Sequence, residues 1–104
     1  MAILYIAEFA EIAVGPAGKV GQFAMQPTLA EQTVVIGAGS LQSSAFNTNT
    51  RIVRLHSDVA AEVKFGTNPT AVLNTTARMA ANQTEYFGVP QGQAFKVAVI
   101  APTV

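Results

Sequence analysis

Three neighbouring residues, His56, Ser57 and Asp58, carry the side chains of a hydrolytic triad. In such a triad the histidine takes the serine proton and the carboxylate orients the imidazole, so all three side chains must converge on one reacting bond. Adjacent residues of a strand point to opposite faces, and the segment around His56 has the composition of a strand. We therefore expect no triad here, but a histidine at a strand end followed by a turn.

The carboxylates also fail to form a catalytic or metal-binding set. Glu8 and Glu11 are separated by an odd number of residues, so in a strand they face opposite ways and cannot act as an acid/base pair. The remaining acids are scattered, whereas calcium needs a cluster of oxygen ligands. The chain has one histidine and no cysteine, which excludes multi-histidine and thiolate metal sites. We expect a protein that is not an enzyme and holds no metal or cofactor.

Two glycine-containing segments resemble phosphate-binding loops only in part. Residues 15–20 read Gly-Pro-Ala-Gly-Lys-Val, without the four-residue spacer of a phosphate loop, and Val20 stands where Ser or Thr would meet Mg²⁺. Residues 37–40 read Gly-Ala-Gly-Ser, but Gln42 occupies the place of the third glycine of a dinucleotide fingerprint, and no long helix follows. Both segments predict turns.

The elements that position these residues are predicted to be strands. Val, Ile and Thr together number 28 against five Leu, and β-branched side chains fit a pleated sheet better than a helix. Clusters of Gly, Pro and Asn divide the 104 residues into short runs. These features predict an all-β chain that forms one small antiparallel β-sandwich or barrel-like domain over residues 1–104, with short connecting turns. Residues 74–81 could form a short helix, or a loop that leads into a strand at 83–89.

The second half of the chain alternates between apolar and polar residues. In residues 59–65 and 95–101 alternate positions are apolar, as in strands with one buried face, and residues 50–57 show a weaker form of the pattern. The side chains expected to face the core in the first two of these segments are Val59, Ala61, Val63, Phe65, Phe95, Val97, Val99 and Ala101. Residues 50–57 place Arg51, Val53 and Leu55 opposite Ile52, Arg54 and His56.

The first half is apolar on both faces of its expected strands. Residues 1–14 carry apolar side chains at odd and even positions, and residues 33–36 have no polar face. A small two-sheet domain has a single interior, so the second face must be covered by a loop, a helix or another subunit. Residues 1–14 could therefore be an interface strand or arm. The side chains expected at such an assembly interface are Tyr5, Phe9, Phe23 and Val35.

Charge is sparse and balanced. Charged residues make up 12% of the chain, apolar residues 50%, and the formal net charge is zero, which favours association over a solvated monomer. We expect a homo-oligomer. Arg51, Arg54, Lys64 and Arg78 could contact a nucleic acid with Tyr86 and Phe87 stacking on bases, but acidic residues interleave with them. Without a net positive field or a long apolar span, we expect no nucleic acid and no membrane partner.

The second half resembles small structural proteins of tailed bacteriophages. The similar segments are Thr-Arg-Ile-Val-Arg-Leu at 50–55, residues 59–65 running into Gly-Thr-Asn-Pro-Thr at 66–70, Thr-Glu-Tyr-Phe-Gly-Val at 84–89, and Phe-Lys-Val-Ala-Val-Ile at 95–100. They cover about half of the chain and contain strands and turns, not a catalytic signature.

This resemblance implies a non-enzymatic virion component. The first expectation is a decoration or cement protein on the capsid exterior, with the major capsid protein and copies of itself as partners. A head–tail connector or a tail subunit is the alternative within the same particle. A carbohydrate-binding module for host attachment is the alternative from another class. Such a module needs exposed aromatic side chains on a platform, and the chain has no Trp and only the tyrosines Tyr5 and Tyr86.

Overall fold

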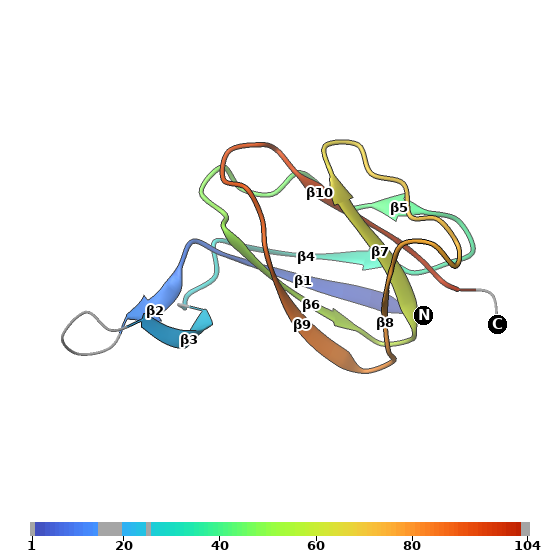
Figure 1. Cartoon of the computed structure of the whole chain (residues 1–104), viewed down its shortest axis with the longest axis horizontal. Helices are drawn as coiled ribbons and strands as arrows, with labels where there is room; N and C mark the ends of the chain where they lie inside the picture. The colour runs from blue at the N-terminus through green and yellow to red at the C-terminus, as the bar shows by residue number, and fades with distance from the viewer. Residues whose placement is uncertain (1, 15–19, 25, 103–104) are drawn as a thin grey trace.

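The fold is a sandwich of two four-stranded antiparallel sheets, seen in a computed structural model that describes residues 2–14, 20–24 and 26–102. Sheet I has the strand order β4 (Ala30–Val35), β1 (Ile3–Phe9), β6 (Ile52–Ser57) and β9 (Gln83–Gly88). Sheet II has the order β5 (Leu41–Gln42), β10 (Lys96–Ile100), β7 (Ala61–Gly66) and β8 (Ala77–Met79). A hairpin of β2 (Ile12–Val14) and β3 (Val20–Ala24) projects from the sandwich (Figure 1). No helix occurs in these residues, and the prediction of an all-β fold is confirmed.

The core lies between the two sheets and is built from the alternating positions of the central strands. Val53 and Leu55 of β6 face Val97 and Val99 of β10, and all four are fully buried. Phe65 packs on the same core with its ring centroid 5.1 Å from that of Phe87. The predicted inner faces of the second-half strands are confirmed, apart from Val59, which is exposed in the turn between β6 and β7.

Residues 74–81 form a turn and then the short strand β8, not a helix. Met79 of β8 pairs with Ala61 of β7 and is 1% exposed within the core. Ala77 to Ala81 have a weak intrinsic preference for a helix, but burial of Met79 in the core stabilises the strand more. Tertiary packing often outweighs such a local preference.

β1 is an inner strand of sheet I, paired with β4 on one side and with β6 on the other. Leu4 and Ile6 on its inner face belong to the core. On its outer face Ala7 and Phe9 are buried by the chain itself, at 8% and 1% exposure, while Tyr5 is 46% exposed. Residues 3–9 are therefore a central strand of the domain. Its outer apolar face is exposed at Tyr5 and half-buried at Ile3.

The outer face of sheet II is covered by a loop of the same chain. Ala98 and Ile100 point away from the core, and both are buried against Ala71 and Leu73 of the segment between β7 and β8. The carboxylate of Glu62, on the same outer face and 2% exposed, accepts a hydrogen bond of 2.6 Å from the Asn74 backbone N–H through Oε1. The loop therefore buries the outer apolar face of β10, while the core buries its inner face.

Glu8 is the buried polar centre of sheet I. It points between the sheets, is 1% exposed, and its Oε1 accepts hydrogen bonds from the Asn47 backbone N–H at 2.7 Å and the Thr50 hydroxyl at 2.8 Å. Its Oε2 accepts a longer bond of 3.2 Å from Gln32 Nε2. Glu11 is exposed and follows the end of β1, so it does not share the buried position of Glu8. Glu8 ties the segment between β5 and β6 to β1 and β4.

Candidate functional site

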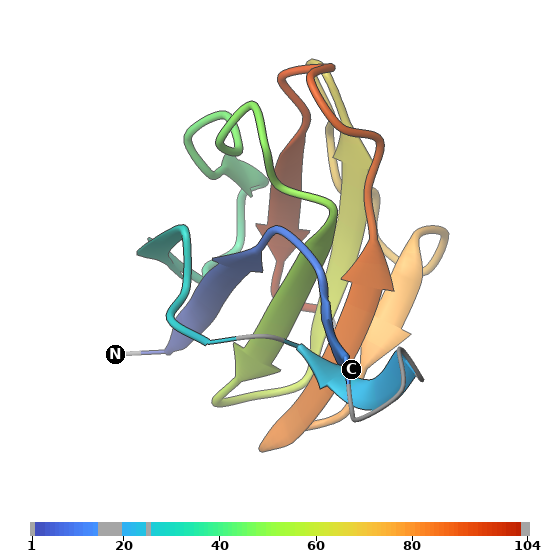
Figure 2. The same ribbon diagram turned by 90° about the vertical axis from the view of Figure 1, so that its left-hand side faces the viewer.

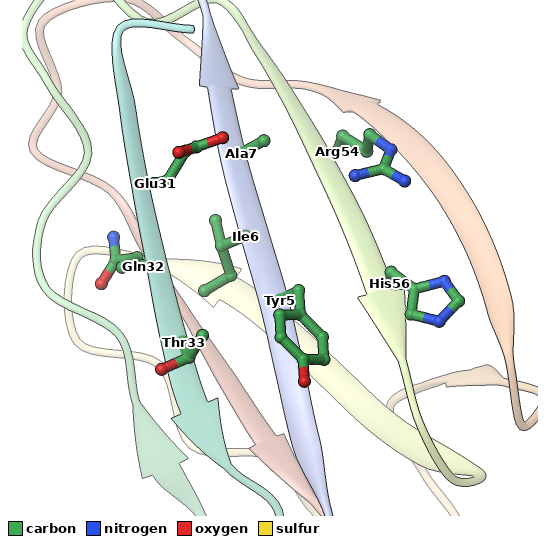
Figure 3. A pocket seen from close by; sticks show the side chains of 8 residues that line it. All are labelled: Tyr5, Ile6, Ala7, Glu31, Gln32, Thr33, Arg54 and His56. Atoms are coloured by element: carbon green, nitrogen blue, oxygen red, sulfur yellow. The ribbon is translucent and has the colours of Figure 1, made fainter.

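The outer face of sheet I carries an open groove of about 580 Å³. Figure 3 shows it centred on β1, with side chains of β4 on one side and of β6 on the other. The residues that line it are Tyr5, Ile6, Ala7, Glu31, Gln32, Thr33, Arg54 and His56.

The strand register arranges the groove in two rows. In one row Ala7 lies opposite Glu31 of β4 and Arg54 of β6, so a methyl group forms the floor between a carboxylate and a guanidinium (Figure 3). In the next row Tyr5 lies opposite Thr33 and His56. Because opposite residues of antiparallel strands share a face, the six side chains of these rows point to the same outer surface.

His56 is held at the rim of the groove. Its Nδ1 lies 2.8 Å from the Thr84 hydroxyl oxygen of β9, and its ring centroid lies 6.3 Å from that of Tyr5. Ser57 points to the opposite face, is fully buried and donates its hydroxyl to the Val59 carbonyl. The histidine and the serine therefore do not face one another, as the alternation of a strand predicts.

Tyr86 extends the same face onto β9. It lies opposite Arg54, is 55% exposed, and its ring centroid is 6.5 Å from that of the buried Phe9. Two exposed tyrosines, Tyr5 and Tyr86, thus stand on one surface with Arg54 and His56 of β6 between their strands.

The basic residues are not brought together. Arg54 lies on the outer face of sheet I, whereas Lys64 and Arg78 lie on strands of sheet II. Arg51 Nη2 donates a hydrogen bond of 3.0 Å to Gln91 Oε1. Phe87 packs on the core, so its ring is not placed to stack on a base. Among the described residues, these four basic side chains and Phe87 are therefore not brought onto one surface.

A second surface, which we call the open side, runs along β4 and β5. These strands are edges of their sheets and lie next to each other at one side of the sandwich (Figure 2). Leu29, Val35 and Leu41 are exposed there at 38%, 42% and 49%. Together with Tyr5 on the neighbouring strand, they are four of the seven large apolar side chains that are exposed among the described residues.

The four residues expected at an interface lie in different surroundings. Tyr5 and Val35 are exposed, one in the groove and the other on the open side. Phe9 is 1% exposed within the isolated chain, because the outer face of sheet I is closed at that end, so it has almost no surface to offer a partner. Phe23 is in β3, and its side chain lies outside the described residues.

Sequence reasoning did not find Glu31, Arg54 and His56 as members of one groove. Each lies on a different segment, and only the register of β1 with β4 and β6 places them in adjacent rows. The exposed apolar residues Leu29 and Leu41 were also missed, since isolated leucines at turns carry no periodic signal.

Among the described residues, no group of three or more His, Cys, Asp or Glu side chains is placed to hold a metal ion. Within the same ranges, no helix is long and apolar enough to cross a membrane. No protein family, curated protein or solved structure matches the chain. The resemblance to phage structural proteins therefore stays a prediction.

Proposed function

We propose that this chain is a non-enzymatic virion structural protein that decorates or cements the exterior of a bacteriophage capsid. It contacts the major capsid protein and further copies of itself. The observation that carries the proposal is the open side, where Leu29, Val35 and Leu41 are exposed beside the free edge of β4. The resemblance of residues 50–101 to tailed-phage structural proteins supports the choice of particle.

The chemistry of this surface suits many weak contacts repeated over a lattice. Buried apolar area contributes roughly 25 cal/mol per Å² before the costs of association, so a small apolar contact gives only modest affinity alone. Repetition on a symmetric shell raises the avidity well above that of one contact. A surface with few charges lowers the desolvation cost of each contact.

The test is cosedimentation of the purified chain with DNA-free shells of the phage whose genome encodes it. We expect saturable binding, and binding at least about tenfold weaker for the double substitution Val35→Lys and Leu41→Lys, because two buried ammonium groups oppose the contact. Val72→Lys is the matched control, since Val72 is 48% exposed but lies in the loop that covers sheet II. Failure of the unmodified chain to bind shells would contradict the proposal.

A head–tail connector or a tail subunit would use the same surface in another part of the particle. Labelling of intact virions with antibody and gold separates these roles. Label spread over the capsid supports decoration, whereas label confined to the neck or tail identifies the alternative.

A second candidate function is binding of a saccharide in the groove of sheet I. It is favoured by one observation: Tyr5 and Tyr86 share an exposed face with Glu31, Arg54 and His56. Exposed aromatic rings stack on the apolar faces of sugars, and carboxylate and guanidinium groups bond to sugar hydroxyls.

A glycan array tests this candidate directly. Binding of the unmodified chain that is lost in Tyr5→Ala and in Tyr86→Ala, but kept in Val72→Ala, would support it. An array without signal, or a signal unchanged by both tyrosine substitutions, would contradict it.

A further inference from the structure

The free edge of β4 exposes backbone groups in a defined order. Next to β4 the Ile36 N–H donates to the Ala2 carbonyl at 3.0 Å, toward β1. In an antiparallel pair alternate residues bond to the same neighbour, so the even-numbered residues of β4 face β1. Glu31, Thr33 and Val35 therefore direct their N–H and C=O groups to the open edge. Among the described residues, none of these three takes part in a backbone hydrogen bond outside the strand pairs.

β4 lacks the features that normally protect an edge strand. Short length, proline, bulges and several charges prevent edges from pairing with other chains. In sheet II the two edges are short, since β5 has two residues and β8 has three. β4 has six residues, regular pairing with β1, no proline and the single charge of Glu31. The segment around Ser44 lies close to Gln32, whose side chain forms hydrogen bonds of 2.9 Å and 3.3 Å with the Ser44 backbone. Among the described residues, this segment forms no backbone-to-backbone hydrogen bond with β4.

The opposite edge of sheet I is less suited to pairing. There the Val89 N–H donates to the Arg51 carbonyl at 2.8 Å, which leaves Thr84, Tyr86 and Gly88 of β9 at the edge. Gly88 weakens a strand, and Pro90 follows soon after it. Among the exposed large apolar residues, Val35 lies in β4, Leu29 directly before it and Leu41 in the neighbouring β5, whereas β9 carries Tyr86 alone.

We propose that β4 pairs antiparallel with β4 of a second copy, about a two-fold axis that passes through Thr33. In this register Thr33 lies opposite Thr33 of the second copy, and Glu31 lies opposite Val35 of the second copy. In this register Glu31, Thr33 and Val35 of both copies each donate and accept a backbone hydrogen bond. It also keeps the two Glu31 side chains about 14 Å apart along the strands, since each residue advances about 3.4 Å.

The pairing rests on the proposed function, because it supplies the self-contact of a decoration protein. It joins two copies of sheet I into one continuous sheet and places their grooves on the same face. Cross-strand Thr–Thr contacts are favourable, and Val35 gains cover from the stem of Glu31 of the second copy. We infer that the partner is a second copy of this chain, because in this register each backbone donor at the edge of one β4 meets a backbone acceptor of the other β4.

Cysteine cross-linking tests the register, since the chain has no cysteine of its own. Opposite residues of a hydrogen-bonded pair lie about 5.5 Å apart between Cα atoms, within the range that a disulfide spans. We expect Thr33→Cys to form a covalent dimer under mild oxidation. Glu31→Cys and Val35→Cys should cross-link when mixed but not separately. Thr84→Cys, on the edge strand β9, is the control and should stay uncross-linked.

Charge substitution provides a second test that does not depend on oxidation. Like charges directly opposite each other are destabilising, so Thr33→Glu alone and Thr33→Lys alone should be monomeric in sedimentation velocity. An equimolar mixture of the two should restore the dimer. Thr33 is exposed on the outer face, so circular dichroism of both variants should match the unmodified chain.

The outcomes separate the pairing from the proposed function. If Thr33→Cys does not cross-link, or Thr84→Cys cross-links equally well, the pairing through β4 is wrong. A chain that binds shells but stays monomeric on them and in solution also overturns the pairing and leaves the proposed function intact. A dimer with the predicted register that binds no shells supports the pairing and contradicts the capsid role.

Discussion

At the scale of single residues, the polar contacts of Glu8 hold the first strand to the rest of the domain. Its carboxylate accepts hydrogen bonds from the Asn47 backbone N–H and the Thr50 hydroxyl, both in the segment between β5 and β6, and from the Gln32 side chain of β4. Among the described residues, no buried side-chain nitrogen or oxygen atom lacks a hydrogen-bond partner. A buried carboxylate is tolerated here because donors converge on both of its oxygens.

Replacing Glu8 with alanine should therefore be costly. The Asn47 N–H and the Thr50 hydroxyl would lose their acceptor, and each unsatisfied buried group costs about 1–3 kcal/mol. We expect Glu8→Ala to lower the free energy of unfolding by about 2–4 kcal/mol in denaturant titrations. Glu11→Ala, at an exposed site, should change it by less than about 0.5 kcal/mol. Equal effects of the two substitutions would contradict this role of Glu8.

Residue types predicted relations within one strand better than contacts between distant segments. Alternation along a strand was enough to separate His56 from Ser57, and the structure places them on opposite faces. The burial of Glu8 was not predictable, because its donors lie 24 to 42 residues away in the sequence. Long-range partners of this kind leave no local signal.

At the scale of elements, the loop between β7 and β8 decides whether sheet II has an exposed apolar face. Ala71 and Leu73 cover Ala98 and Ile100, and the loop is fastened to the sheet through the Asn74 N–H and Glu62. Asn74 adopts a φ of 59°, a left-handed conformation that asparagine tolerates better than most residues. The first part of the loop is held separately, by hydrogen bonds from the Gln42 side chain to Asn68 and Pro69 and from the Ala71 N–H to the Ser40 hydroxyl, so Glu62 secures the part at Asn74.

Removing the carboxylate of Glu62 should loosen this loop. We expect Glu62→Ala to speed cleavage by a nonspecific protease between β7 and β8, because exposed, weakly held loops are the preferred sites of nicking. Lys64→Ala, at an exposed position on the same strand and face, is the matched control and should leave the cleavage rate unchanged. Identical cleavage of the unmodified chain and Glu62→Ala would show that the loop is held without this bond.

For strands with one polar face the sequence predicted which side chains are buried. For strands with two apolar faces it did not predict what covers the second face. The pattern of residues 59–65 and 95–101 assigned the core positions of β7 and β10, because alternation directly reports a half-buried face. For β1 the sequence left open whether a loop, a helix or a subunit covers the second face. The structure shows that Ala7 and Phe9 are enclosed within the chain and Tyr5 is not, which depends on tertiary packing.

At the scale of the whole molecule, the distribution of exposed apolar groups gives the sandwich a distinct side. A folded monomer of this size is expected to expose about 5,600 Å², and the chain exposes 5920 Å². Its radius of gyration of 14.0 Å exceeds the roughly 13 Å typical of a domain of this length, in line with the projecting hairpin (Figure 1). Few charges are spread over this surface, and three of the seven large apolar side chains that are exposed among the described residues lie in or next to β4 and β5.

Hydrogen exchange of the free chain and of the shell-bound chain tests most directly whether the open side along β4 and β5 contacts the capsid and neighbouring copies. In the free chain, at a concentration low enough to keep it monomeric, the amides of Glu31, Thr33 and Val35 should exchange rapidly, because they face the open edge. On shells we expect their exchange to slow by at least about tenfold, while the edge amides of β9 change little. Protection confined to β9, or unchanged exchange along β4 in chains that are bound to shells, would contradict the account.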